Sequence, residues 1–167
     1  MESTDLTRIF AVVTVLTLII YADPGTAGGG SAGVAEDTAL VNLPVEDIAD
    51  EFKKIRGIKS HFDGGAWNDE ADKWMGRKHR LMIKLGLRLA DGKYEKSDII
   101  KLLDPPDLIV GKGDYLFELI ISQKRYDPLT AASYEFLVYY WRGSHDFLFF
   151  TCQDGVIINS GWWYAGE

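Results

Sequence analysis

The chain has 167 residues, of which 47% are hydrophobic, and a formal net charge of −7. This length fits one domain, and five Trp, eight Tyr and eight Phe supply ample material for an apolar core. The acidic balance argues against a nucleic-acid-binding protein, because neutralising phosphates requires a basic surface. The single cysteine, Cys152, excludes an intramolecular disulfide, and alternation along its segment predicts a buried side chain.

The N-terminus contains an apolar run, Ile9 to Ala22, that is typical of a signal-peptide core. Its fourteen residues are few for a membrane-spanning helix, which needs about 20. We predict a signal peptide at residues 1–22 and hence a secreted protein. The alternatives are an uncleaved membrane anchor, the only expected membrane contact, and a buried strand or helix. Residues 23–43, rich in Pro, Gly, Ala and Ser, predict a flexible linker before a single domain at 44–167.

Three helices are predicted in the first half of this domain. Residues 44–55 carry an apolar face and end at Gly57, and residues 95–103, with Ser97 as a possible cap, end at a Pro-Pro sequence. The strongest pattern spans residues 68–89, with Asn68 as N-cap. Helical spacing predicts that six of its apolar side chains face the core: Ala71, Trp74, Met75, Met82, Leu85 and Leu89.

The same helical segment carries a basic stripe at spacings of three and four residues. Its members are Lys73, Arg77, Arg80, Lys84 and Arg88. Residues 51–101 hold thirteen basic and eight acidic groups, net +5, whereas residues 102–167 hold four and nine, net −5. This asymmetry indicates either attraction between two parts of one fold or a basic helix face that meets an acidic partner.

The second half of the domain reads as antiparallel β-structure. A first strand is predicted at residues 115–121, after a turn at 111–114 and before a polar connection at 123–133. A meander follows, with strands at 134–141, 146–152 and 156–164, rich in β-branched and aromatic residues. The predicted fold class is therefore α+β, with N-terminal helices packed on a three- to four-stranded antiparallel meander.

Both faces of this meander are apolar. Alternation places Phe136 and Val138 on one face and Leu137, Tyr139 and Trp141 on the other. In the last strand it places Ile157 with Trp163, and Trp162 on the opposite face. A one-sided sheet in water alternates with polar residues instead. Either both faces are covered within the monomer, or one face is a contact surface.

The chain resembles a known family in the order of its elements. The segment Ser97-Asp98-Ile99-Ile100-Lys101-Leu102-Leu103-Asp104-Pro105-Pro106-Asp107 and the aromatic strand ending Tyr139-Tyr140-Trp141-Arg142 resemble the SmpA/OmlA (BamE) outer-membrane assembly lipoproteins and the related β-lactamase-inhibitor-protein fold. The resemblance covers residues 68–164, and Asp104 replaces the usual glycine. It implies a non-catalytic role in binding another protein. Lipid anchoring requires a cysteine directly after the N-terminal apolar run, and this chain has none at that place. The whole chain is also similar to small secreted proteins of fungal type, which implies no mechanism.

The catalytic motifs are weak. Ser144-His145-Asp146 contains the residue types of a hydrolase triad, but neighbours in an extended segment point to opposite faces. His145 and Asp146 are thus only candidate catalytic groups, and Arg142 with His145 forms a candidate anion-binding pair. The three histidines, His61, His79 and His145, share no metal-ligand spacing. We expect no metal and no cofactor.

The preferred interpretation is a non-enzymatic secreted binding protein that acts through an aromatic sheet face or the basic stripe. Its expected partner is another protein or a second copy of the chain. The second interpretation is a carbohydrate-binding module using Trp162, Trp163 and Tyr139, and Trp141 is a further candidate binding residue of the aromatic sheet. The third is a small hydrolase in which His145 is the acid/base and Arg142 holds an anion.

Overall fold

The structure is a computed structural model that describes residues 43–166. The signal peptide or anchor predicted at residues 1–22, and the linker up to residue 42, lie outside this range. The described elements are α2 (Val45–Arg56), the 3-10 helix η1 (His61–Asp63), α3 (Arg77–Leu89), α4 (Lys96–Leu103), β1 (Leu108–Gly111), α5 (Tyr115–Lys124), α6 (Pro128–Ala131), β2 (Tyr134–Trp141), β3 (Gly143–Gln153) and β4 (Val156–Tyr164). The predicted α+β class is confirmed.

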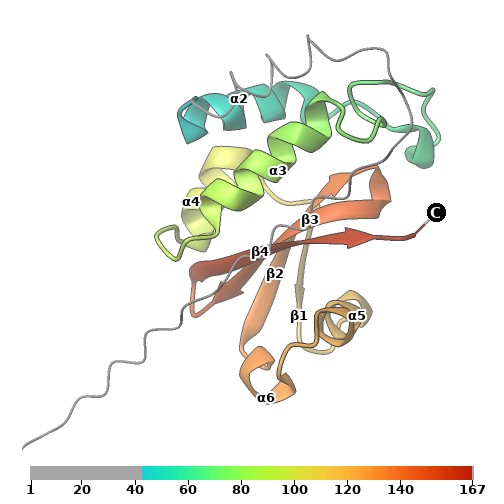
Figure 1. The fold of residues 1–167 in the computed structure, drawn as a ribbon. Coiled ribbons are helices and arrows are strands. Elements are labelled where there is room, and N and C mark those ends of the chain that lie inside the picture. Colours follow the sequence, from blue (N-terminus) through green and yellow to red (C-terminus); the bar gives the residue numbers. More distant parts are fainter. Residues whose placement is uncertain (1–42, 167) are drawn as a thin grey trace, which may run out of the picture.

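The four strands form one antiparallel sheet in the order β1-β2-β3-β4. Figure 1 shows the sheet as the middle of three layers, with α2, α3 and α4 on one side and α5 and α6 on the other. Because α5 and α6 lie between β1 and β2 in the chain, that connection covers one face of the sheet. The predicted meander is therefore present, with one additional edge strand.

Each face of the sheet has its own core. The first core joins α2, α3 and α4 to Leu137, Tyr139, Trp141, Leu148, Phe150, Cys152 and Ile157. The second joins α5 to Val110, Phe136, Val138, Phe147 and Phe149. Cys152 is buried, as predicted, and burial raises the pKa of its thiol. Both sheet faces are thus covered within the monomer.

The strand predicted at residues 115–121 is wrong, because this segment forms helix α5. Its buried side chains are Phe117, Ile120 and Ile121, which have helical spacing. A segment of seven residues, six of them apolar, fits both the helical and the strand period, so tertiary packing decides between them. Here the helix packs on the second face of the sheet, where Phe117, Ile120 and Ile121 belong to the second core.

The helix predicted at residues 68–89 begins nine residues later than expected, at Arg77. Residues 68–75 form turns, in which the Asn68 side chain accepts the amides of Glu70 and Ala71 at 2.9 and 3.3 Å. The expectation that Trp74 and Met75 face the core is consequently wrong, since they are 57% and 41% exposed. The other four predicted core residues, Ala71, Met82, Leu85 and Leu89, are buried.

The remaining local predictions mostly agree with the structure. Helices α2 and α4 match the predicted segments, but the cap of α4 is Glu95 in a capping box with Asp98, rather than Ser97. In β4, a register shift opposite Thr151 and Cys152 leaves Ile158 as an extra residue. Ile157 therefore shares a core with Trp162 instead of Trp163, which corrects the predicted faces of this strand.

Gly161 is required by the packing of the second core. It lies opposite Phe149 on β3, and a Cβ at Gly161 would approach Phe149 Cζ to 2.5 Å. Phe149 is fully buried, so its ring has no free space into which to move. We expect Gly161→Ala to lower the free energy of unfolding by about 2 kcal/mol in urea denaturation, because overpacking forces the core apart. The control Gly57→Ala has no neighbour within 4 Å and a φ of −77°, so it should be neutral; equal stability of the two variants would contradict this packing.

Candidate functional site

The segment between α2 and α3 is folded around one buried carboxylate. Asp72 is fully buried, and its two oxygens accept the backbone amides of His61 at 3.0 Å and Asn68 at 2.8 Å. These bonds close residues 61–72 into a compact loop. The loop carries Trp67, whose indole N–H donates to Asp69 at 2.7 Å, so that the ring stays on the surface with 55% exposure.

Trp141 joins this loop to the sheet. Its ring is fully buried, and its indole Nε1–H donates to the carbonyl of Ala71 at 2.7 Å. His79 on α3 stacks on the same ring, with centroids 4.0 Å apart and planes 9° apart. Trp74 meets it edge-on at 5.7 Å. The buried indole of Trp141, at the end of β2, therefore contacts both the loop and α3.

Arg142 makes the second junction. Its Nε and one terminal nitrogen donate to Asp146 Oδ2 at 2.7 and 2.6 Å. Its guanidinium carbon lies 4.4 Å from the Trp141 ring centre and 4.8 Å from that of Phe62, which belongs to the loop. Asp146 Oδ1 accepts the amide of Ala165, just after β4, at 3.1 Å. Arg142 and Asp146 thus hold the loop and the C-terminal end of β4 against the β2–β3 hairpin.

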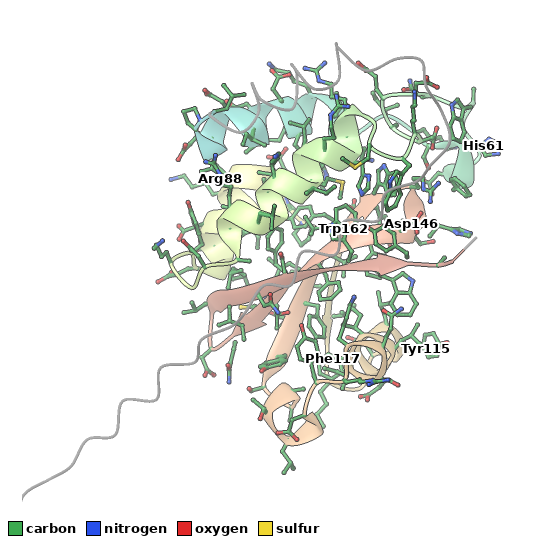
Figure 2. All side chains as sticks on the ribbon, in the orientation of Figure 1. His61, Arg88, Tyr115, Phe117, Asp146 and Trp162 are labelled. Atoms are coloured by element: carbon green, nitrogen blue, oxygen red, sulfur yellow. The ribbon has the colours of Figure 1, made fainter. Side chains whose placement is uncertain are left out.

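The loop and the adjoining strand ends carry a set of side chains that we call the aromatic surface: Phe62, which is half-buried, and Trp67, Trp74, Met75, His145 and Tyr164, which are exposed. His145 lies 5.1 Å from Phe62, and Trp74 lies 5.4 Å from Tyr164, between ring centres. A pocket of about 440 Å³ lies within it, lined by Trp74, Arg142, Asp146, Tyr164 and Gly166. Figure 2 shows His61 and Asp146 at this same end of the molecule.

The aromatic residues predicted to bind a ligand do not share a surface. Tyr139 and Trp141 are fully buried, and the Tyr139 hydroxyl donates to the carbonyl of Asp104 at 3.1 Å. Trp162 and Trp163 are half-buried and pack against different cores. The structure therefore places Tyr139 and Trp141 in the interior and leaves only parts of the other two rings exposed.

The candidate catalytic pair is not brought together. Asp146 is buried, and its oxygens are occupied by Arg142 and the amide of Ala165. His145 is exposed and packs on Phe62. Within residues 43–166 no hydrogen bond joins His145 to Asp146 or to Ser144. Arg142 is only 16% exposed and already paired, so its main role is to hold the loop.

Four of the five residues of the basic stripe, all except Lys73, lie on helix α3. Arg77 forms ion pairs with Glu51 on α2 and with Glu70 in the loop. Arg80 donates to the carbonyl of Met75 at 2.8 Å, and Lys84 is half-buried. Both partners of Arg77 belong to residues 51–101, so these pairs do not join the basic segment to the acidic one. The ion pairs Arg56–Asp107 at 3.2 Å and Lys96–Glu135 at 2.5 Å do join the two segments.

Within residues 43–166 no group of three or more His, Cys, Asp or Glu side chains is arranged to hold a metal ion. In the same range, no helix is long and apolar enough to cross a membrane. No protein-family profile matches the chain, and neither a curated protein nor a solved structure is significantly similar to it. The resemblance to the BamE lipoproteins therefore stays a prediction.

Sequence reasoning missed most of the aromatic surface. Phe62, Trp67 and Trp74 lie in a loop whose turns are closed by Asn68 and Asp72. The available signal was the cluster His61 to Trp67, where two glycines interrupt three aromatic or imidazole rings and amphipathic spacing is absent. The structure also places Tyr164 at the end of β4, beside Trp74.

His79 makes the fold sensitive to acid. Its Nδ1 accepts the amide of Met75 at 3.1 Å, so the proton of the neutral ring lies on Nε2, 3.5 Å from the Tyr164 hydroxyl. Burial, aided by the charge of Arg142, lowers the pKa of His79 from 6.5 to about 4. Below pH 6.5 the unfolded chain therefore binds a proton that the folded chain does not, until about pH 4.

We expect this difference to remove about 3 kcal/mol of stability between pH 6.5 and pH 4. Urea denaturation across this range checks the slope, and NMR of the ring protons locates the pKa. In His79→Gln the part of the slope of unfolding free energy against pH that comes from carboxylates should persist, while the part that comes from the histidine should disappear. A His79 resonance that titrates near pH 6.5, or an unchanged slope in the variant, would contradict the assignment.

Proposed function

We propose that the protein is a non-enzymatic binding protein that recognises a protein partner through the aromatic surface. The observation that carries this proposal is the clustering of Trp67, Trp74, Met75 and Tyr164, all more than a third exposed, at one end of the sheet. Trp and Tyr are enriched among the residues that dominate protein–protein binding energy, and Met is enriched at interfaces. Among the other Trp, Tyr and Phe rings of residues 43–166, Tyr115 on α5 is the one that is also exposed, so this concentration needs an explanation other than core packing.

The supporting contacts favour a preorganised surface. Asp72, Trp141 and Arg142 each fix the loop by contacts within the fold. A surface held in this way loses little side-chain and loop entropy on association, which raises the affinity obtained from a given contact area. The pocket between Trp74 and Tyr164 would accept one projecting side chain of the partner.

The same geometry gives less support to the other two interpretations. A sugar-binding platform uses flat exposed rings, but Trp74 and Tyr164 are tilted by 51° to each other, and Tyr139 and Trp141 are buried. A hydrolase needs an acid/base pair, but the His145 ring packs on Phe62, whereas the Asp146 carboxylate is paired with Arg142. Secretion remains part of the proposal on the strength of the apolar run at residues 9–22 alone.

Trp74→Ala tests the proposal. Affinity capture with the purified protein identifies bound proteins, and biolayer interferometry with each purified candidate measures the dissociation constant. Since hot-spot aromatic residues contribute about 2 kcal/mol or more, we expect Trp74→Ala to weaken binding at least about tenfold. The control Tyr115→Ala removes a ring that is 81% exposed on α5, on the other side of the sheet, and should leave binding unchanged.

The outcomes separate the interpretations. Equal affinity of the wild type and Trp74→Ala for every captured protein would overturn the proposed surface. Retention of an oligosaccharide rather than a protein, again lost in Trp74→Ala, would replace the protein partner by a carbohydrate. A concentration-dependent dimer in gel filtration that disappears in Trp74→Ala, but persists in Tyr115→Ala, would identify the partner as a second copy of the chain.

A further inference from the structure

A second pocket, of about 420 Å³, contains an unusual lysine. Its polar lining comes from Arg56, Lys59, Asp63, Lys78, Asp107 and Tyr140, and it shares no lining residue with the pocket of the aromatic surface. We call it the lysine pocket. Gly143 also lines it, and the absence of a side chain there is necessary, because Asp63 Oδ1 lies 2.1 Å from where a Cβ would be. Its volume falls within the range of sites for small molecules.

Lys78 is placed against the ordinary rules of stability. The residue is only 4% exposed, and its ammonium donates to the carbonyl of Arg56 at 3.3 Å. Within residues 43–166 it forms no ion pair with a carboxylate at 4 Å or less. It is also the second residue of α3, where the helix dipole disfavours a positive charge. Burying a charge with so few partners is costly, and such costs are typical of functional positions.

The other charges of the pocket are largely satisfied by one another. Arg56 pairs with Asp107 at 3.2 Å and also donates to the carbonyls of Leu103 and Pro105. The second Asp107 oxygen accepts the amide of Tyr140 at 2.7 Å. Both oxygens of the nearby Asp72 accept loop amides. Among the residues that line the pocket, the charges left after the Arg56–Asp107 pair are the two ammonium groups of Lys78 and Lys59 and the one carboxylate of Asp63.

We propose that the lysine pocket binds a small organic anion, whose carboxylate or phosphate group is held by the ammonium of Lys78 inside and that of Lys59 at the rim. One negative charge would balance the excess positive charge of the lining. The remaining donor protons of Lys78 would hydrogen-bond to the anion, and charge-assisted hydrogen bonds of this kind are the strong ones. The Tyr140 ring in the lining would contact the apolar part of the ligand.

The titration of Lys78 gives this site a characteristic pH dependence. Burial lowers the pKa of Lys78 to about 8, although Asp107, Asp63 and Asp72 act to raise it and Arg56 lowers it further. Lys59 and Tyr140 are the other titratable groups of the lining. An anion beside Lys78 favours its charged form, so binding and protonation are linked. Affinity for the anion should therefore fall as the pH rises through 8.

Isothermal titration calorimetry with inorganic phosphate and with acetate, at constant ionic strength in chloride, tests the site with defined probes. We expect saturable binding of at least one probe that weakens by about tenfold between pH 7 and pH 9. Lys78→Met should abolish it and Lys59→Met should weaken it severalfold. The matched control Lys112→Met removes an exposed ammonium in the β1–α5 turn and should leave binding unchanged. Preference for phosphate or for acetate identifies the head group.

Thermal melting supplies a readout that separates binding from folding. Because Lys78→Met replaces a poorly paired buried charge by an apolar chain of similar length, this variant should melt at a higher temperature than the wild type in the absence of probe. If the variant fails to fold, the pH dependence of the wild type and the loss in Lys59→Met still decide the question. Equal binding by all three variants, or no saturable binding below about 10 mM, would overturn the proposal.

Discussion

The hydrogen bond from the Trp141 indole to the carbonyl of Ala71 is the contact on which the rest of the molecule depends. A buried indole N–H needs an acceptor, because an unsatisfied buried donor costs about 1–3 kcal/mol. Here the acceptor lies 70 residues earlier in the chain, in the loop before α3. Satisfying one donor in the sheet therefore also fixes the position of the loop. His79 and Arg142 then stack on the same indole, so that the core and the exposed surface share one support.

A second constraint is that both faces of the sheet are apolar. In a chain with a single cysteine, stability must come from burial, and neither face can be left to water. The connection between β1 and β2 meets this requirement by forming α5, whose Phe117 packs on Phe136 at 5.4 Å between ring centres. Figure 2 shows Phe117 and Trp162 on opposite sides of the sheet. With both faces covered, the exposed rings of Trp67, Trp74 and Tyr164 lie at the end of the sheet, and Tyr115 on α5 is exposed elsewhere.

Sequence patterns predicted the elements whose periodicity is long and whose boundaries are marked. Helix α2 has an apolar stripe ending at Gly57, and the last hairpin of the meander turns at Asp154-Gly155. The connection between β2 and β3 is tighter than predicted, because β3 begins at Gly143 instead of residue 146. The run at residues 115–121 was too short to distinguish helix from strand, and Asn68 capped a turn as effectively as it would cap a helix. The bulge at Ile158 shifts the alternation by one residue, which local propensity does not report.

The candidate sites were harder to predict than the fold, because exposure and charge pairing depend on contacts between distant segments. Arg142 and Lys78 illustrate the difference. Both are cations close to carboxylates. Arg142 forms an ion pair with Asp146 and packs on two aromatic rings, whereas Lys78 donates to one backbone carbonyl. The partners of Arg142 all come from the fold itself, and they account for its position through stability alone. Those of Lys78 do not, so the lysine is the better indicator of a ligand although it carries no sequence motif. Because the two pockets share no lining residue, recognition of a partner and binding of an anion can be separated by substitution at one site at a time.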